Sequence, residues 1–320
     1  MIDRGSAQPS FVERERAVDV GSTTTQGAVT RIANTSAGPI EYHIDGAGPV
    51  VLVLKGGHCS RRTRLGHERL AAHGFTVVEP SRPGYDRTPA WVGRSAQEAA
   101  DAIAALLDAL AIEDVAVVGI SAAGHTAIEL ARRHPGRVRR VSFESARALP
   151  WDMRTRLGGR ILFGRPEALV WAMVRAGLRW APTQTLRVLL SDLTTLDPGT
   201  VVKRMDASTR AQLITVFASL RSAEGFICDL EHASAAETPL SQPTLILHGR
   251  HDRSIPVEHV RRLQALCPDH EVVELDADTH FIWVGRSAEE VWETRLDFLT
   301  GGHRRDGRFG DERAAPDMPL

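Results

Sequence analysis

The most constraining feature of this sequence is a serine that follows a short apolar run and precedes a helical pattern. Residues 115–118 read VAVV, residues 119–124 read GISAAG, and helical spacing then begins at once. This order is typical of a buried strand, a sharp turn and a helix. Such a turn raises the hydroxyl of Ser121 clear of the strand end, beside helix N-terminal N–H groups. The small residues Gly119 and Ala123 suit a turn of this kind, and we interpret Ser121 as a candidate nucleophile.

Short apolar runs alternate with helical patterns along most of the chain. Residues 50–54 form a continuous apolar run, the type of strand that a parallel sheet buries on both faces. Ser95 and Glu98 form a capping box at the start of one helix, and a further helix is expected over 61–73. The alternation predicts an α/β fold with a doubly wound, mostly parallel, eight-stranded sheet flanked by helices.

The alternation lapses between residues 146 and 237, which we interpret as a helical cap inserted after the sixth strand. Ligands bind at the carboxyl ends of the strands in such sheets, so the cap would cover the site. Helices are expected over 151–163, 166–180, 183–191, 199–206 and 208–223. Most apolar side chains of the cap should pack it onto the sheet, and some should line a pocket. These side chains are Trp151, Leu157, Ile161, Phe163, Trp171, Met173 and Trp180.

The remaining chain divides into a core and two extensions. Residues 28–145 and 238–301 are expected to form the α/β core. Residues 1–27 and 302–320 are polar and charged without lasting apolar periodicity, and we interpret them as a flexible N-terminal extension and a flexible C-terminal tail.

Composition argues against several kinds of partner. Lys plus Arg (39) nearly equals Asp plus Glu (40), which does not suit nucleic acid or an anionic membrane. Cys59, Cys228 and Cys267 are far apart, which argues against a disulfide framework or a zinc site. The sequence also shows no signal-peptide pattern and no apolar stretch of about 18 residues. We expect a cytoplasmic protein that uses no metal or other cofactor, and its oligomeric state stays open.

A serine nucleophile needs a base, and the base needs an orienting acid. His280 follows the predicted strand 271–275, and Asp252 follows the predicted strand 244–247, so both lie at the sheet edge expected for Ser121. Asp252 would accept the Nδ1–H of His280 and stabilise the imidazolium. Glu144, which follows a third predicted strand, is a possible alternative acid.

The order Ser121, Asp252, His280 resembles that of lidded α/β-hydrolase fold enzymes over about residues 28 to 300. GISAA at 119–123 is similar to the nucleophile turn of that family, in its GxSxA form. HGRHDRSIP at 248–256 is similar to the acid loop and THF at 279–281 to the histidine loop, and EPSRPGYDRT at 79–88 resembles the loop after the fourth strand. Each motif is weak alone, but three in order are a strong combination.

The resemblance also implies an oxyanion hole made of two backbone N–H groups. One belongs to Ala122, the residue after the nucleophile. By position the other belongs to Gly57, with His58 as the near alternative. Lys55 stands where the family usually has a histidine, so the support of this loop departs from the pattern.

The function that follows is acyl transfer in two steps, with a small-molecule substrate and water as the second substrate. An ester of a small to medium apolar substrate is the first expectation. A C–C bond hydrolase, a lactonase, a perhydrolase and a non-catalytic ligand receptor of the same fold are alternatives. Haloalkane dehalogenase and epoxide hydrolase chemistry is disfavoured, because those relatives carry an aspartate where this chain has Ser121.

Overall fold

The computed structural model describes residues 30–302 and contains an eight-stranded sheet in the order β1-β2-β4-β3-β5-β6-β7-β8. Neighbouring strands from β4 through β8 run parallel, whereas β2 runs antiparallel to both β1 and β4. The predicted α/β class and mostly parallel sheet are therefore confirmed. The strands are β1 (Thr30–Thr35), β2 (Gly38–Gly46), β3 (Val50–Leu54), β4 (Thr76–Pro80), β5 (Val115–Ile120), β6 (Val138–Glu144), β7 (Thr244–Gly249) and β8 (His270–Leu275).

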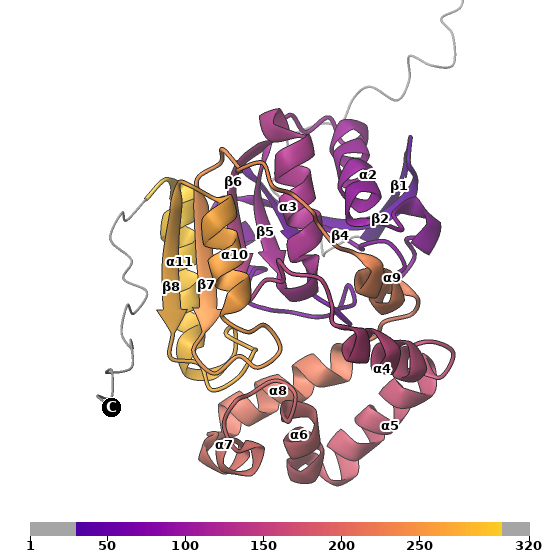
Figure 1. The fold of residues 1–320 in the computed structure, drawn as a ribbon, viewed down its shortest axis with the longest axis vertical. Coiled ribbons are helices and arrows are strands. Elements are labelled where there is room, and N and C mark those ends of the chain that lie inside the picture. Colours follow the sequence, from indigo (N-terminus) through magenta and orange to yellow (C-terminus); the bar gives the residue numbers. More distant parts are fainter. Residues whose placement is uncertain (1–29, 303–320) are drawn as a thin grey trace, which may run out of the picture.

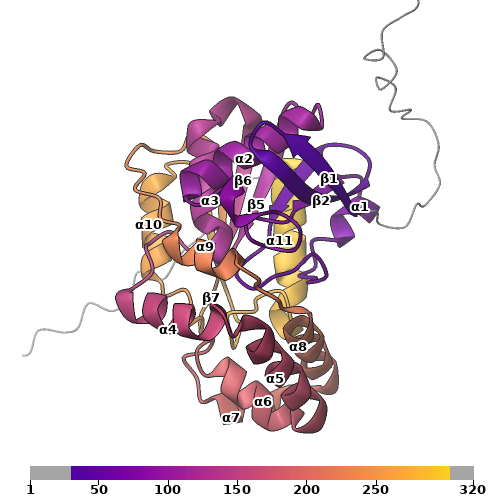
Figure 2. The same cartoon turned by 90° about the vertical axis from the view of Figure 1, so that its right-hand side faces the viewer.

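Helices cover both faces of the sheet (Figure 2). One face packs against α2 (Ala96–Ala109), α3 (Gly124–Arg133) and α10 (Glu258–Leu266). The other face packs against α1 (Arg69–Ala72) and α11 (Ala288–Thr300). The central strands are apolar because both of their faces are covered, and every residue of β5 is buried. Their carboxyl ends therefore form one edge at which loops of distant sequence meet.

The chain leaves the sheet between β6 and β7 and forms six helices over residues 145–243, which we call the insertion. Most of the insertion lies beyond the carboxyl ends of the parallel strands (Figure 1). Its helices are α4 (Met153–Phe163), α5 (Glu167–Trp180), α6 (Pro182–Leu190), α7 (Pro198–Arg204), α8 (Ala207–Ser219) and α9 (Gly225–Glu231). The first five correspond to predicted helices, whereas helical spacing did not predict α9.

The helix predicted over 61–73 is wrong in length, because only α1 forms. The preceding turns are held by the insertion instead. Ser60 Oγ donates to the carbonyl of Ser219 at 2.8 Å, and Thr63 Oγ1 lies 2.9 Å from Ser219 Oγ. The predicted capping box of Ser95 and Glu98 is present at the start of α2.

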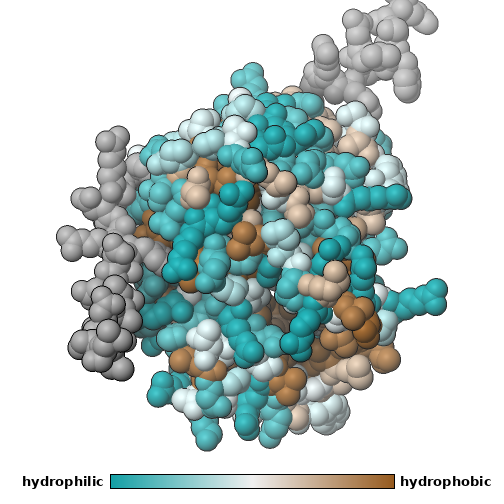
Figure 3. Space-filling model, in the orientation of Figure 1, coloured by the Kyte–Doolittle hydropathy of each residue, from teal (hydrophilic) through white to brown (hydrophobic). Residues whose placement is uncertain are grey.

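None of the helices within residues 30–302 has the length and apolarity needed to cross a bilayer. The same residues hold no group of three or more His, Cys, Asp or Glu side chains placed to share a metal ion. Apolar side chains gather on the outer surface of the insertion around α4 and α5 (Figure 3). The extension predicted over 1–27, and all but the first residue of the tail predicted over 302–320, lie outside the described residues.

Candidate active site

Ser121 joins β5 to α3 in a backbone conformation that few residues adopt. Its φ angle is +49°, in the left-handed region, and strain of this kind is common where a strand end presents a nucleophile. Two glycines make room for the turn. A Cβ on Gly119 would lie 2.7 Å from Ala127 Cβ, and a Cβ on Gly124 would clash with the carbonyl oxygen of Arg147. The strand, tight turn and helix around this serine are thus present as expected.

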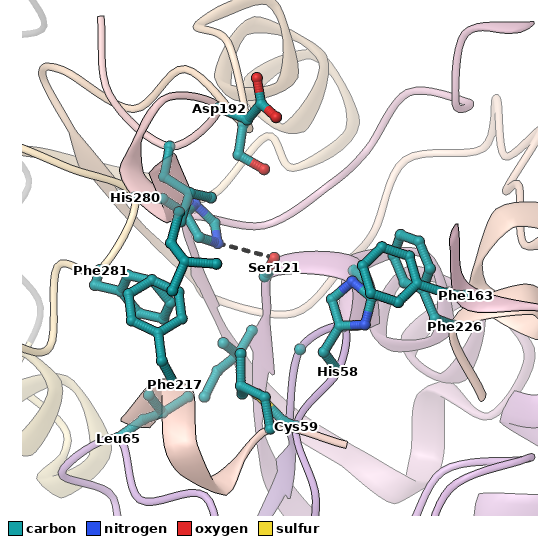
Figure 4. A pocket seen from close by; sticks show the side chains of 18 of the residues that line it. His58, Cys59, Leu65, Ser121, Phe163, Asp192, Phe217, Phe226, His280 and Phe281 are labelled. Carbon is teal, nitrogen blue, oxygen red and sulfur yellow. Dashed lines mark hydrogen bonds between the residues drawn. The ribbon is translucent and has the colours of Figure 1, made fainter. Parts of the chain in front are cut away.

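His280 links Ser121 to Asp252 by two hydrogen bonds. Its Nε2 lies 3.0 Å from Ser121 Oγ (Figure 4), and its Nδ1 lies 2.7 Å from Asp252 Oδ2. Asp252 Oδ1 accepts the backbone N–H of Ile255 at 2.9 Å, which holds the carboxylate in place. An ionised carboxylate only accepts, so Nδ1 carries the proton and Nε2 is free to accept from the serine hydroxyl. The structure therefore brings together three residues that follow the carboxyl ends of β5, β7 and β8.

Glu144, the alternative acid, makes different contacts at the end of β6. Its carboxylate accepts from Arg295 Nε at 2.7 Å and from Arg295 Nη2 at 2.6 Å. It also accepts from Trp283 Nε1 at 2.5 Å. Both Glu144 and Arg295 are buried. The structure places Asp252, and not Glu144, at Nδ1 of His280.

The loop after β3 packs against the serine turn. A Cβ on Gly56 would lie 2.8 Å from Ser121 Cβ, and a Cβ on Gly57 would lie 3.4 Å from Ala122 Cβ. The backbone N–H of His58 donates to Tyr85 Oη at 3.1 Å, so this alternative oxyanion donor is already engaged. Gly57 and Ala122 remain the predicted pair of donors, and their two segments lie side by side.

Lys55, at the position where the resemblance implied a histidine, is buried and paired. Its ammonium lies 3.0 Å from Glu79 Oε2, and His67 Nε2 lies 3.1 Å from Glu79 Oε1. Burial alone would raise the pKa of Glu79, but His67 and Lys55 outweigh it and hold that pKa well below its usual range. The carbonyl oxygen of Lys55 also accepts from Arg82 Nε at 2.6 Å. The loop after β3 thus has an ionic anchor of its own. We call residues 55–58 the oxyanion loop, because they include Gly57, the predicted oxyanion donor.

A cavity of about 300 Å³ opens beside Ser121 and the oxyanion loop. This volume is at the small end of the range for ligand pockets. Its aromatic side chains form two groups on opposite sides of Ser121 (Figure 4). The His58 group consists of His58, Trp151, Phe163, Trp171 and Phe226, with contacting ring centroids 3.9 to 5.7 Å apart. The His280 group consists of Phe217, His280, Phe281 and Trp283.

The cavity wall carries little formal charge. Among the described residues that line it, Asp192 is the one carboxylate, and none is a lysine or arginine. Cys59 also lines the cavity, and burial raises the pKa of its thiol to about 11, so it stays protonated at neutral pH. The site is therefore suited to a largely neutral, apolar ligand.

The apolar residues singled out in the insertion separate into two sets. Trp151, Phe163 and Trp171 line the cavity, as some of them were expected to do. The other four are exposed on the outer surface, and they are Leu157, Ile161, Met173 and Trp180. On α5 both faces carry apolar residues, so helical periodicity alone cannot say which face is inward. Phe217 and Phe226 also line the cavity, and no local pattern in the sequence distinguished them.

Comparisons with known proteins agree with this architecture. The alpha/beta hydrolase family model matches residues 43–294. The chain is 30% identical over 271 residues to the uncharacterized hydrolase YcgS of Bacillus subtilis, covering 82% of the chain and 95% of that protein. It is 26% identical over 259 residues to a 2-hydroxy-6-oxo-2,4-heptadienoate hydrolase of Pseudomonas putida, covering 78% and 85% respectively. An alpha/beta hydrolase fold protein from Nakamurella multipartita superposes with a TM-score of 0.72 at 25% identity, covering 86% and 100%.

Proposed function

Since the chain belongs to the alpha/beta hydrolase family, we propose that it is a serine hydrolase that cleaves an ester or related acyl bond of a small to medium apolar substrate. The observation that carries the proposal is the hydrogen-bonded chain from Asp252 through His280 to Ser121. Its serine lies on the wall of an apolar cavity, next to the backbone segments of Gly57 and Ala122, whose N–H groups we propose as the oxyanion donors.

In the first step, His280 Nε2 takes the proton of the Ser121 hydroxyl as Oγ attacks the carbonyl carbon. The backbone N–H groups of Gly57 and Ala122 hold the negative charge that develops on the carbonyl oxygen. Asp252 keeps the imidazole in the required tautomer and stabilises the imidazolium that forms. His280 then gives its proton to the leaving group, and the acyl group stays on Ser121.

In the second step, water takes the place of the leaving group beside His280. His280 removes a proton from this water while the oxygen attacks the acyl carbon. The oxyanion is held by the same two N–H groups. When the ester bond to Ser121 breaks, His280 returns the proton to Oγ, which releases the acid and restores the enzyme.

A second candidate is hydrolysis of a C–C bond, which the likeness to the heptadienoate hydrolase favours. A heptadienoate is by its name a carboxylate. The cavity wall offers Asp192 and, among the described residues, no lysine or arginine to pair with such a group. A carboxylate without a cation would be costly to bury. The charges of the cavity therefore favour a neutral ester over a dienoate.

A fluorophosphonate probe tests the nucleophile directly, because it phosphonylates an activated serine. We expect folded wild-type protein to be labelled stoichiometrically and the Ser121→Ala variant to stay unlabelled under the same conditions. Intact-protein mass spectrometry reads both results, and circular dichroism checks that the variant is folded. Equal labelling of the two proteins would contradict the assignment of Ser121, and no labelling of wild type would favour a non-catalytic ligand receptor.

The bond type is tested on a panel of 4-nitrophenyl esters, lactones and 2-hydroxy-6-oxo-dienoates. We expect esters of short acyl chains to be cleaved with the highest kcat/KM, since the cavity is small and neutral. Turnover of the dienoates alone would instead support the C–C candidate.

A further inference from the structure

The His58 group carries four polar ring atoms, and Nε2 of His58 is the one that is left free to contact a ligand. The indole N–H of Trp151 donates to the carbonyl of Asp229 at 2.8 Å, and that of Trp171 donates to Ser222 Oγ at 3.0 Å. His58 Nδ1 also contacts Ser222 Oγ, at 2.5 Å. Within residues 30–302, His58 Nε2 has no hydrogen-bond partner, while the residue lines the cavity and is only half-buried.

The contacts of Ser222 determine which nitrogen of His58 carries the proton. A serine hydroxyl has one proton to donate, and Trp171 can only donate to it. The hydroxyl proton therefore goes to His58 Nδ1, because otherwise it would be left without an acceptor in a buried site. Glu167 Oε1 accepts the backbone N–H of Ser222 at 2.7 Å and holds the residue in place. Neutral His58 consequently carries its proton on Nε2.

The surroundings of His58 keep the ring neutral. Its centroid lies 3.9 Å from that of Phe226 and 4.3 Å from that of Phe163. Burial lowers the pKa of His58 to about 3, against the opposing effect of Asp229. At neutral pH the ring therefore offers the cavity an N–H donor, and not a positive charge.

The proposed reaction indicates which part of the substrate meets this donor. The leaving group must lie near Nε2 of His280 to receive its proton, and the oxyanion must face Gly57 and Ala122. The acyl group takes the remaining direction, away from His280. His58 lies on that opposite side of Ser121 (Figure 4).

We propose that His58 is a specificity-determining residue whose Nε2–H hydrogen-bonds an oxygen on the acyl group of the substrate. The enzyme then prefers alkoxy-, hydroxy- or oxo-acyl esters over plain alkanoyl esters of the same size. An alkanoyl group would displace water from Nε2–H and offer it no acceptor, which costs binding in an otherwise apolar wall. The proposal rests on the proposed hydrolase function and names its substrate class.

Pairs of esters that differ by one oxygen test the proposal. 4-Nitrophenyl methoxyacetate and butyrate differ by O in place of CH2, and the 3-methoxypropanoate and pentanoate esters place the same exchange one atom further out. Each kcat/KM is divided by the rate constant for hydroxide hydrolysis of that ester, which removes intrinsic reactivity. The oxygen-over-methylene ratio is this corrected kcat/KM for the oxygen-containing ester divided by that for its methylene counterpart. We expect the ratio to fall about tenfold from wild type to His58→Phe in at least one pair.

Two further variants separate hydrogen bonding from packing. His58→Gln replaces the ring by an amide that can donate, and should recover part of the ratio. Ser222→Ala keeps the ring but removes the hydroxyl that fixes its tautomer, and should give an intermediate ratio. Equal ratios in wild type and all three variants, for both pairs, would overturn the role of His58 while leaving the hydrolase function intact. Wild-type protein that neither reacts with the fluorophosphonate nor cleaves any ester would instead overturn the underlying function.

Discussion

At the scale of single residues, two buried carboxylates at the same sheet edge have different contacts. Asp252 accepts from His280 and from one backbone N–H. Glu144 accepts from two nitrogens of the Arg295 guanidinium, Nε and Nη2, and from Trp283 Nε1. The first carboxylate can act on the imidazole, whereas the second neutralises a buried cation. Their removal should therefore change different properties of the protein.

We expect Asp252→Asn to lower kcat on 4-nitrophenyl butyrate by a factor on the order of 10³ to 10⁴, since an amide would favour the wrong tautomer of His280. Glu144→Gln should instead lower the free energy of unfolding by about 3–5 kcal/mol, because Arg295 would keep an unpaired buried charge. Stopped-flow or steady-state kinetics reads the first change and urea unfolding the second. A folded Glu144→Gln protein without turnover, beside an active Asp252→Asn protein, would reverse the two assignments.

At the scale of elements, the oxyanion loop is held by segments from three parts of the chain. Lys55 at its start contacts Glu79 of β4, and Arg82 and Tyr85 follow β4 in the next loop. Arg82 and Tyr85 both donate to Asp229 of α9, with the Tyr85 hydrogen bond at 2.6 Å. The helix that sequence periodicity missed thus supports the loop that departs from the family pattern.

The ion pair of Lys55 and Glu79 is tested by a double-mutant cycle. Lys55→Met removes the ammonium beside buried Glu79 and leaves it with His67 at 3.1 Å and the Arg64 guanidinium at 3.4 Å, so it should be destabilising. Adding Glu79→Gln should recover part of the loss, with a coupling free energy of at least about 1 kcal/mol in urea unfolding. Additive effects of the two substitutions would show that the pair does not anchor the loop.

At the scale of the whole molecule, two buried histidines tie the ends of the insertion to the core. His259 of α10 accepts the backbone N–H groups of Ala148 and Leu149 through Nδ1, at 2.9 and 3.1 Å. His125 of α3 accepts the N–H of Ser234 at 3.1 Å through Nδ1 and so donates from Nε2 to the carbonyl of Leu149 at 3.1 Å. Both rings must stay neutral, since protonation would remove the acceptor nitrogen.

The stability of the protein should therefore fall in mild acid. Burial, assisted by the charge of Arg147, lowers the pKa of His259 to about 3, and burial lowers that of His125 to about 4. Their unfolded value is about 6.5, so below this pH the unfolded chain binds more protons than the folded one. Each histidine contributes stability that is complete above about pH 6.5 and declines by up to roughly 1.4 kcal/mol per pH unit toward its folded pKa.

Urea unfolding at pH 8, 7, 6 and 5.5 measures this decline above the range in which most carboxylates titrate. The His259→Gln variant is the matched control, because its amide oxygen can accept the same N–H groups without titrating. We expect its free energy of unfolding to depend less steeply on pH than that of wild type. Parallel pH profiles would contradict a neutral His259 in the native state.

The class of fold and the order of the candidate triad could both be predicted from the sequence alone. Alternating strand and helix patterns predicted the parallel sheet, and the tight turn around Ser121 predicted where its hydroxyl would be presented. The positions of Asp252 and His280 after predicted strands placed them at the same edge. These features are readable because strand burial, turn geometry and strand ends are encoded by residues that adjoin in the chain.

Three features could not be predicted without the folded structure: which acid contacts His280, which apolar residues of the insertion turn inward, and what surrounds His58. Asp252 and His280 are 28 positions apart, and His58 and Ser222 are 164 positions apart. Contacts at such separations depend on how whole elements pack, and periodicity within one element carries no information about its partner. The same reason explains why Trp180 is exposed while Trp171, on the same helix, is buried against the cavity.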